Sequence, residues 1–111
     1  MSAGWFELKK ASNGQYHFVL KAGNAETILS SEMYVAKPSA LNGIASVQKN
    51  AADAARYHKM TATNGKFYFT LKAANHQVIG NSQMYASEAS RDTGIASVQK
   101  NGATATIKDL S

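Results

Sequence analysis

An internal repeat constrains the fold of this chain more than any other feature. Residues 11–52 align without a gap on residues 62–103, and 22 of the 42 aligned residues are identical. The longest shared block, G-I-A-S-V-Q-K-N, begins at Gly43 and again at Gly94. Repeats of this kind indicate that one supersecondary unit occurs twice.

The two copies are expected to share one hydrophobic core. A unit of about fifty residues buries too little apolar surface to be stable alone. No stretch rich in Gly, Ser or Pro separates the copies as a flexible linker would. We therefore predict a single domain over residues 1–111, with repeat 1 at about 5–54 and repeat 2 at about 55–109.

Alternating apolar residues predict three strands at the start of repeat 1. Residues 6–10 and 16–21 flank Ser12-Asn13-Gly14, and Asn-Gly is a strong signal for a hairpin turn. Residues 22–25 form a second turn, and residues 26–30 a short third strand. The matching strands of repeat 2 are expected at residues 67–72 and 77–81.

A helix follows the three strands in each copy, at about residues 37–49 and 88–100. Pro38 suits a first helical turn, and Ser87 is a plausible N-cap. Asn50 and Gly102 are interpreted as helix-stopping residues. The first helix carries an apolar stripe at helical spacing, which comprises Ala40, Ile44, Val47 and Ala51.

Glycine is unfavourable inside a helix by roughly 1 kcal/mol relative to alanine. Gly43 and Gly94 lie at the edge of the apolar stripe, so we expect them to allow a close approach between helix and sheet.

A further strand-like segment follows each helix, at residues 55–60 and 104–109. The first of these also precedes the second hairpin, so it can serve both copies. The predicted fold class is α+β: two tandem β(3)-α-β repeats related by a pseudo-two-fold axis. They would form one antiparallel sheet of about seven strands, with both helices on one face.

These motifs resemble the YegP-like family of small bacterial proteins. The resemblance rests on F-E-L-K-K at residues 6–10, the N-G-x-Y-x-F-x-L-K-A-x-N segment, S-E-M-Y, and N-G-I-A-S-V-Q-K-N. Repeat 2 departs from the pattern at Gln83, at Thr93 and over residues 57–60. The resemblance implies the same fold with C-terminal strands exchanged between the units, and it implies no established activity.

Composition excludes several classes of protein. The chain has no cysteine, which excludes disulfides, thiolate zinc sites and cysteine nucleophiles. No apolar run is long enough to span a membrane, and the first residues lack the pattern of a secretory signal. We therefore expect a cytoplasmic protein. We also expect a monomer: the resemblance implies that single-repeat relatives pair, and here the duplication supplies the second repeat within one chain.

The sequence predicts no enzyme, no metal site and no cofactor. The histidines are scattered at His17, His58 and His76, without the spacing of converging metal ligands. No carboxylate in one copy is matched by a carboxylate in the other. Neither a nucleophile elbow nor a glycine-rich phosphate loop is present. No catalytic residue is therefore assigned.

Polar residues repeated in both copies are the one positive indication of a site. The candidate ligand-binding residues are Lys21, Asn24, Lys49, Lys72, Asn75 and Lys100. In one interpretation they are structural: the asparagines stabilise turns, and the lysines at 49 and 100 complement helix C-termini. In the other they form two equivalent sites, or one composite site across the pseudo-two-fold axis, for an anionic or amide-bearing ligand.

The net charge of +5 also allows weak binding of nucleic acid or another polyanion. Tyr68 and His17 are expected on the sheet face opposite the helices, where bases could stack. Phe18 and Phe69 share the alternation of Leu20 and Leu71, so we expect them in the core. The leading hypothesis is a non-enzymatic binding or interaction module, with polyanion binding by the open sheet face as the alternative.

Overall fold

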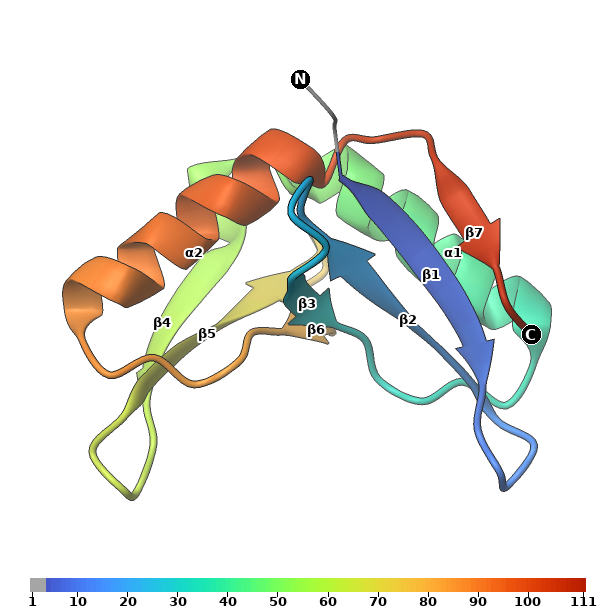
Figure 1. The fold of residues 1–111 in the computed structure, drawn as a ribbon, viewed down its shortest axis with the longest axis horizontal. Coiled ribbons are helices and arrows are strands. Elements are labelled where there is room, and N and C mark those ends of the chain that lie inside the picture. Colours follow the sequence, from blue (N-terminus) through green and yellow to red (C-terminus); the bar gives the residue numbers. More distant parts are fainter. Residues whose placement is uncertain (1–3) are drawn as a thin grey trace.

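The computed structural model describes residues 4–111, and Figure 1 shows their arrangement. Seven strands, two α-helices and one short 3₁₀ helix follow each other in the described chain. In order they are β1 (Trp5–Lys10), β2 (Tyr16–Lys21), β3 (Thr27–Ser30), α1 (Lys37–Asn50), η1 (Ala54–Arg56), β4 (Tyr57–Thr61), β5 (Phe67–Lys72), β6 (Val78–Asn81), α2 (Glu88–Asn101) and β7 (Ile107–Asp109).

The strands form one sheet in the order β4-β5-β6-β3-β2-β1-β7. The two copies meet where β3 pairs with β6, and the β1–β2 and β4–β5 hairpins diverge on either side of this centre (Figure 1). The predicted α+β class, the tandem repeats and the single seven-stranded sheet are confirmed. The exchange of C-terminal strands is also present, because β4 pairs with β5 and β7 pairs with β1.

The prediction of a purely antiparallel sheet is wrong, because β7 runs parallel to β1. The backbone N–H of Gly4 donates to the side-chain oxygen of Asn101 at 3.0 Å, so the end of α2 lies beside the start of β1. A strand that leaves α2 at this point and follows β1 must run in the same direction as β1.

The strand expected at residues 55–60 begins later than predicted. The Asp53 carboxylate accepts a hydrogen bond from the N–H of Ala55, which starts the 3₁₀ turn η1. Tyr57 is the first residue of β4 for this reason. The two hairpin turns are confirmed, since Gly14 and Gly65 both have positive φ, at 85° and 82°.

Ser87 caps α2 as predicted, since its hydroxyl accepts from the N–H of Ser90. Gly102 directly follows the last residue of α2, as predicted for a helix-stopping residue, although its φ of −68° is right-handed. A Cβ at Gly102 would lie 2.4 Å from the Cβ of Ala51. Gly102 therefore allows the ends of α1 and α2 to meet. Asn50 is the last residue of α1, and its amide donates to the Ser46 carbonyl.

One cluster of buried apolar side chains contains residues of both repeats. Phe18 and Phe69 are fully buried, as their alternation predicted, and so are Ala40 and Val47 of the α1 stripe. Leu29 lies near the pseudo-two-fold axis, and a Cβ at Gly80 would lie 2.7 Å from its side chain. Leu29 and Gly80 occupy equivalent positions in the two repeats, so one leucine fills the space beside the axis.

Candidate functional site

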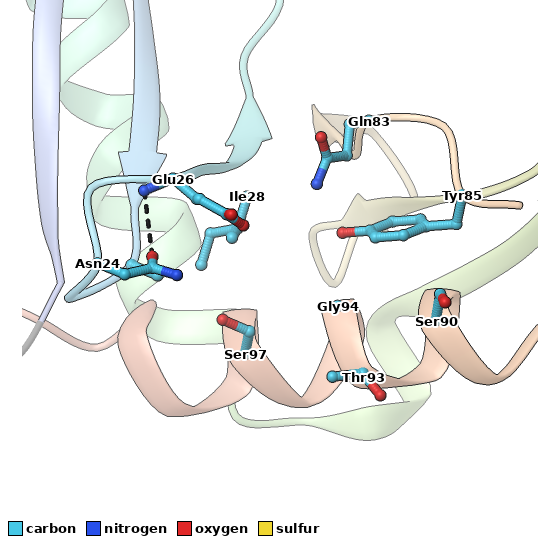
Figure 2. Close-up of a pocket in the computed structure, with 10 residues that line it drawn as sticks. Asn24, Glu26, Ile28, Gln83, Tyr85, Ser90, Thr93, Gly94 and Ser97 are labelled. Atoms are coloured by element: carbon cyan, nitrogen blue, oxygen red, sulfur yellow. Dashed lines mark hydrogen bonds between the residues drawn. The ribbon is translucent and has the colours of Figure 1, made fainter.

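A groove separates the turn between β2 and β3 from helix α2 (Figure 2). Two adjoining cavities, of about 440 and 600 Å³, form it and share several lining residues. The turn belongs to repeat 1 and the helix to repeat 2, so the groove is a composite of both. The polar groups of its walls are mostly amides and hydroxyls, from Asn24, Gln83, Tyr85, Ser90, Thr93 and Ser97.

The turn that forms one wall is held by Asn24. The Asn24 side-chain oxygen accepts a hydrogen bond from the backbone N–H of Glu26 at 3.1 Å, and Ala25 has a φ of 69°. This Asx turn leaves the amide nitrogen of Asn24 turned toward α2 (Figure 2). The carboxylate of Glu26 lies at the same end of the groove.

Tyr85 forms the floor of the groove against α2. Its ring stacks on Phe69 with the centroids 6.4 Å apart, and its hydroxyl points along the helix toward the groove (Figure 2). A Cβ at Gly94 would lie 2.3 Å from this hydroxyl oxygen. The glycine therefore lets the tyrosine lie against the helix backbone. This contact is the close approach between helix and sheet that was expected at Gly94. Tyr34 and Gly43 repeat the arrangement in the other half.

Two of the predicted site residues come together here: Asn24 and Lys100 both line the groove, although they belong to different repeats. Their counterparts, Asn75 and Lys49, lie in the turn between β5 and β6 and on α1. The structural interpretation of the asparagines also applies, since Asn75 accepts a hydrogen bond from the N–H of Gln77 at 3.1 Å.

Lys21 and Lys72 end β2 and β5 and are not among the residues that line the groove. Gln83, Tyr85 and Glu26 also line the groove, and no sequence pattern above indicated them. The repetition of Tyr34 as Tyr85 was visible in the sequence and could have identified the tyrosine. Gln83 and Glu26 have different residues at their repeat counterparts, so the repeat gave no signal for them.

The sheet face opposite the helices carries a different set of groups. Lys108 lies over the ring of Trp5 at 4.3 Å from its centroid, and the indole N–H donates to Glu7 at 2.9 Å. This hydrogen bond lowers the pKa of Glu7 below its usual value. Because Lys108 covers one side of the indole, that ring face is closed to a stacked base.

Within residues 4–111, no group of three or more His, Asp or Glu side chains converges in a way that could bind a metal ion. None of the helices in this part of the chain has the length and apolar character needed to cross a membrane.

Comparison with known proteins identifies the relatives of this chain. Residues 11–57 and 62–109 each match the family described as domain of unknown function DUF1508. A UPF0339 protein of Acinetobacter baylyi is 68% identical over 108 residues, which cover 97% of each chain. The YegP protein of Escherichia coli K12 is 65% identical, over 96% of this chain and 97% of its own.

Solved structures of relatives have the same fold. The solution NMR structure of yegP from E. coli superposes with a TM-score of 0.94 at 64% identity, over 99% of this chain and 95% of that one. The UPF0339 protein from Shewanella oneidensis gives a TM-score of 0.92 at 62% identity, over 98% and 92%. The E. coli protein is described as a protein of unknown function, and no specific activity comes with either match. The chain belongs to the DUF1508 family, in the two-repeat form of the YegP proteins.

Proposed function

We propose that this protein is a non-enzymatic binding module, and that the composite groove binds a small ligand bearing a carboxylate or an amide. The observation that carries the proposal is the meeting of Asn24 and Lys100, from different repeats, across one groove. A ligand in this position contacts both halves of the molecule.

The chemistry of the walls supports this class of ligand. The amide nitrogens of Asn24 and Gln83 and the hydroxyls of Tyr85 and Ser97 are hydrogen-bond donors that border the same space (Figure 2). Lys100 adds positive charge at one end of the groove. Carboxylates and amide carbonyls accept hydrogen bonds from such donors, and a carboxylate also gains from the lysine.

The groove offers binding groups and little that catalysis requires. Glu26 is the one carboxylate among its described lining residues, and no second acid or histidine lies beside it. General acid–base chemistry commonly relies on positioned groups with matched pKa values. Recognition is therefore the role that the groove supports best.

Titration with N-acetylglycine, followed by amide NMR, tests the proposal. We expect shifts in the backbone signals of Gly94 and Ser97 and in the side-chain NH₂ signals of Asn24 and Gln83. The Gln83→Glu variant places a second negative charge in the groove and should weaken binding about tenfold. Gln15→Glu makes the same chemical change on the β1–β2 hairpin and should leave binding unchanged.

Two results would overturn the proposal: no saturable shift in the groove, or equal binding by the two glutamate variants. Mixed single-stranded RNA and DNA test the polyanion alternative. Binding that is present at about 50 mM salt and falls steeply as salt rises would favour that alternative, because phosphate contacts release counterions.

A further inference from the structure

The two outer edges of the sheet are not equivalent, although the repeats are. β7 pairs with the outer edge of β1, whereas no strand within residues 4–111 pairs with the outer edge of β4 (Figure 1). β1 and β4 match in register: Leu8 pairs with Phe18, and Lys59 pairs with Phe69. The first half of the molecule therefore shows how a strand is added to the edge that the second half leaves open.

The backbone N–H and C=O groups of Lys59 point outward from the open edge of the sheet. Lys59 lies opposite Phe69, but the N–H and C=O of Phe69 both bind Ser82, at 2.9 Å each. In an antiparallel pair, a residue whose partner bonds to the other side has its own N–H and C=O on the outer side. The N–H of Tyr57 is already used, since it donates to the Ala54 carbonyl within η1. The N–H and C=O of Lys59 are thus the polar groups at the centre of this edge.

β7 defines three side-chain positions of an added strand. Ile107 lies on the helix side, because its partner in the parallel register is a core residue of β1. Lys108 lies on the opposite side, over the ring of Trp5. Asp109 returns to the helix side and forms an ion pair with Lys37 at the start of α1. The order is apolar, basic, acidic.

The second half has a cavity on the helix side of β4. It measures about 220 Å³, and its walls include Tyr57, Ile95, Gln99 and the ion pair of Lys59 with Asp92. Gln99 is the repeat counterpart of Gln48, whose side chain donates to the Thr104 carbonyl of the segment that leads into β7. An added strand with an apolar residue at the position of Ile107 places that side chain in this cavity.

The charges that face the other two positions are different in the second half. Glu88 is the repeat counterpart of Lys37, and Arg56 at the end of η1 is the counterpart of Trp5. Glu7, which pairs with Lys108, has His58 as its counterpart, so the second half lacks that carboxylate. A basic residue therefore suits the position of Asp109, and an acidic residue suits the position of Lys108. β7 of a second copy has the opposite order of charges. It would place Lys108 beside Arg56 and Asp109 beside Glu88.

The present partners of these two residues do not prevent such contacts. A carboxylate oxygen of Glu88 lies 3.7 Å from a guanidinium nitrogen of Arg91, and the Glu88 side chain is 70% exposed. The Nε of Arg56 lies 3.4 Å from a carboxylate oxygen of the half-exposed Asp53. Exposed ion pairs of this kind contribute little to stability and exchange readily.

We propose that the outer edge of β4 binds an extended segment of a partner protein as a parallel eighth strand, with the residue order apolar, acidic, basic. The backbone of Lys59 supplies the hydrogen bonds, the cavity beside Ile95 takes the apolar side chain, and Arg56 and Glu88 select the charges. Strand addition is an established way for a sheet edge to recognise peptides. The site lies apart from the groove of the proposed function and does not depend on it.

Two peptides test the charge order. One is TATIKDLS, the sequence of residues 104–111, and the other is TATIEKLS, in which the two charges are exchanged. Amide NMR titration of the intact protein should show shifts over residues 57–61 and at Ile95 and Gln99 with TATIEKLS. TATIKDLS should bind about tenfold more weakly, since both charge contacts become repulsive.

Two variants test the geometry. Lys59→Pro removes the outward N–H and should abolish binding, while proline is tolerated on an edge strand whose N–H faces solvent. Lys59→Ala loses the same side chain, including its ion pair with Asp92, but keeps the N–H and should still bind. Glu88→Lys should remove most of the preference between the peptides, because it inverts one charge contact while Arg56 keeps the other, and thermal unfolding verifies that each variant is folded.

Equal affinity of the protein for the two peptides would overturn the proposal. Binding by Lys59→Pro as tight as by Lys59→Ala would do so too. Concentration-dependent pairing of two copies through β4, seen as shifts over residues 57–61 without peptide, would replace it with self-association.

Discussion

The hydroxyl of Tyr85 lies against the backbone of Gly94, so closely that a Cβ on the glycine would be 2.3 Å from the oxygen. Tyr34 and Gly43 make the same contact in the other repeat, where the distance is 2.5 Å. Each tyrosine ring also stacks on a core phenylalanine. The paired glycine and tyrosine therefore fix the distance between helix and sheet in both halves.

The Gly94→Ala variant should be less stable than the parent protein. Alanine favours the helix by roughly 1 kcal/mol, but overpacking costs about 1–3 kcal/mol. The difference is a fall of up to about 2 kcal/mol in the free energy of unfolding, and because the added Cβ would lie only 2.3 Å from the hydroxyl oxygen we expect the upper half of this range, as measured by urea denaturation.

Thr93→Ala is the control, because Thr93 neighbours Gly94 on α2 and is exposed. It should change stability by less than about 0.5 kcal/mol. A Gly94→Ala variant as stable as the control would show that Tyr85 moves away without cost.

Leu29 and Gly80 predict a reciprocal effect near the pseudo-two-fold axis. Leu29→Gly should cost at least the roughly 2–5 kcal/mol of a leucine-to-alanine change, because the fully buried side chain leaves a cavity. Gly80→Leu should also destabilise, since its Cβ would lie 2.7 Å from the Leu29 side chain. The double variant Leu29→Gly/Gly80→Leu exchanges the two side chains. It should lose less stability than the sum of the losses in the two single variants, as measured by thermal unfolding. Losses that simply add in the double variant would contradict the shared space.

Local patterns in the sequence predicted the elements well because their signals are local. The alternation around Phe18, the Asn-Gly turn at Gly14 and the cap at Ser87 each act within a few residues, and the structure agrees with them. The direction of β7 depends instead on the contact between Gly4 and Asn101, which are 97 positions apart. No local pattern records such a contact.

The site was predictable only in part, and for a similar reason. Comparing the repeats identified Asn24 and Lys100 because both copies retain them. Gln83 was not found, since its counterpart is Glu32. Gly102 ends α2 as predicted, but for a reason that no local pattern shows: glycine after a helix commonly takes positive φ, whereas here φ is −68° and the contact with Ala51 requires the glycine.

Cutting the chain after Asp53 tests whether the repeats share one core. The main cluster of buried side chains combines Phe18 and Val47 of the first half with Phe69 and Val98 of the second. Each half alone would expose much of this surface. We expect residues 1–53 and 54–111 each to lack the circular dichroism of a folded protein.

Mixing the two halves should restore the amide NMR spectrum of the intact chain. Two halves that each fold as stable monomers would contradict the shared core.

Docking of β7 should depend on pH through Asp109. Hydrogen bonds from Lys37 and then from Ser111 lower the pKa of Asp109 from 3.8 to about 2. The ionised carboxylate is thus favoured when β7 is docked, so its contribution is complete above about pH 4 and is lost as the pH falls toward 2. Trp5 is the only tryptophan and lies under Lys108 of β7, so its fluorescence should report release of the strand in this range.

Two variants separate Asp109 from the other carboxylate near Trp5. Asp109→Asn removes the titrating group and should show, at neutral pH, the fluorescence that the parent protein reaches near pH 2. Glu7→Gln changes the acceptor of the indole N–H but leaves the pair of Lys37 and Asp109 intact, so its transition between pH 4 and 2 should persist. A transition that is unchanged in Asp109→Asn, or absent in Glu7→Gln, would assign the pH dependence to Glu7 instead.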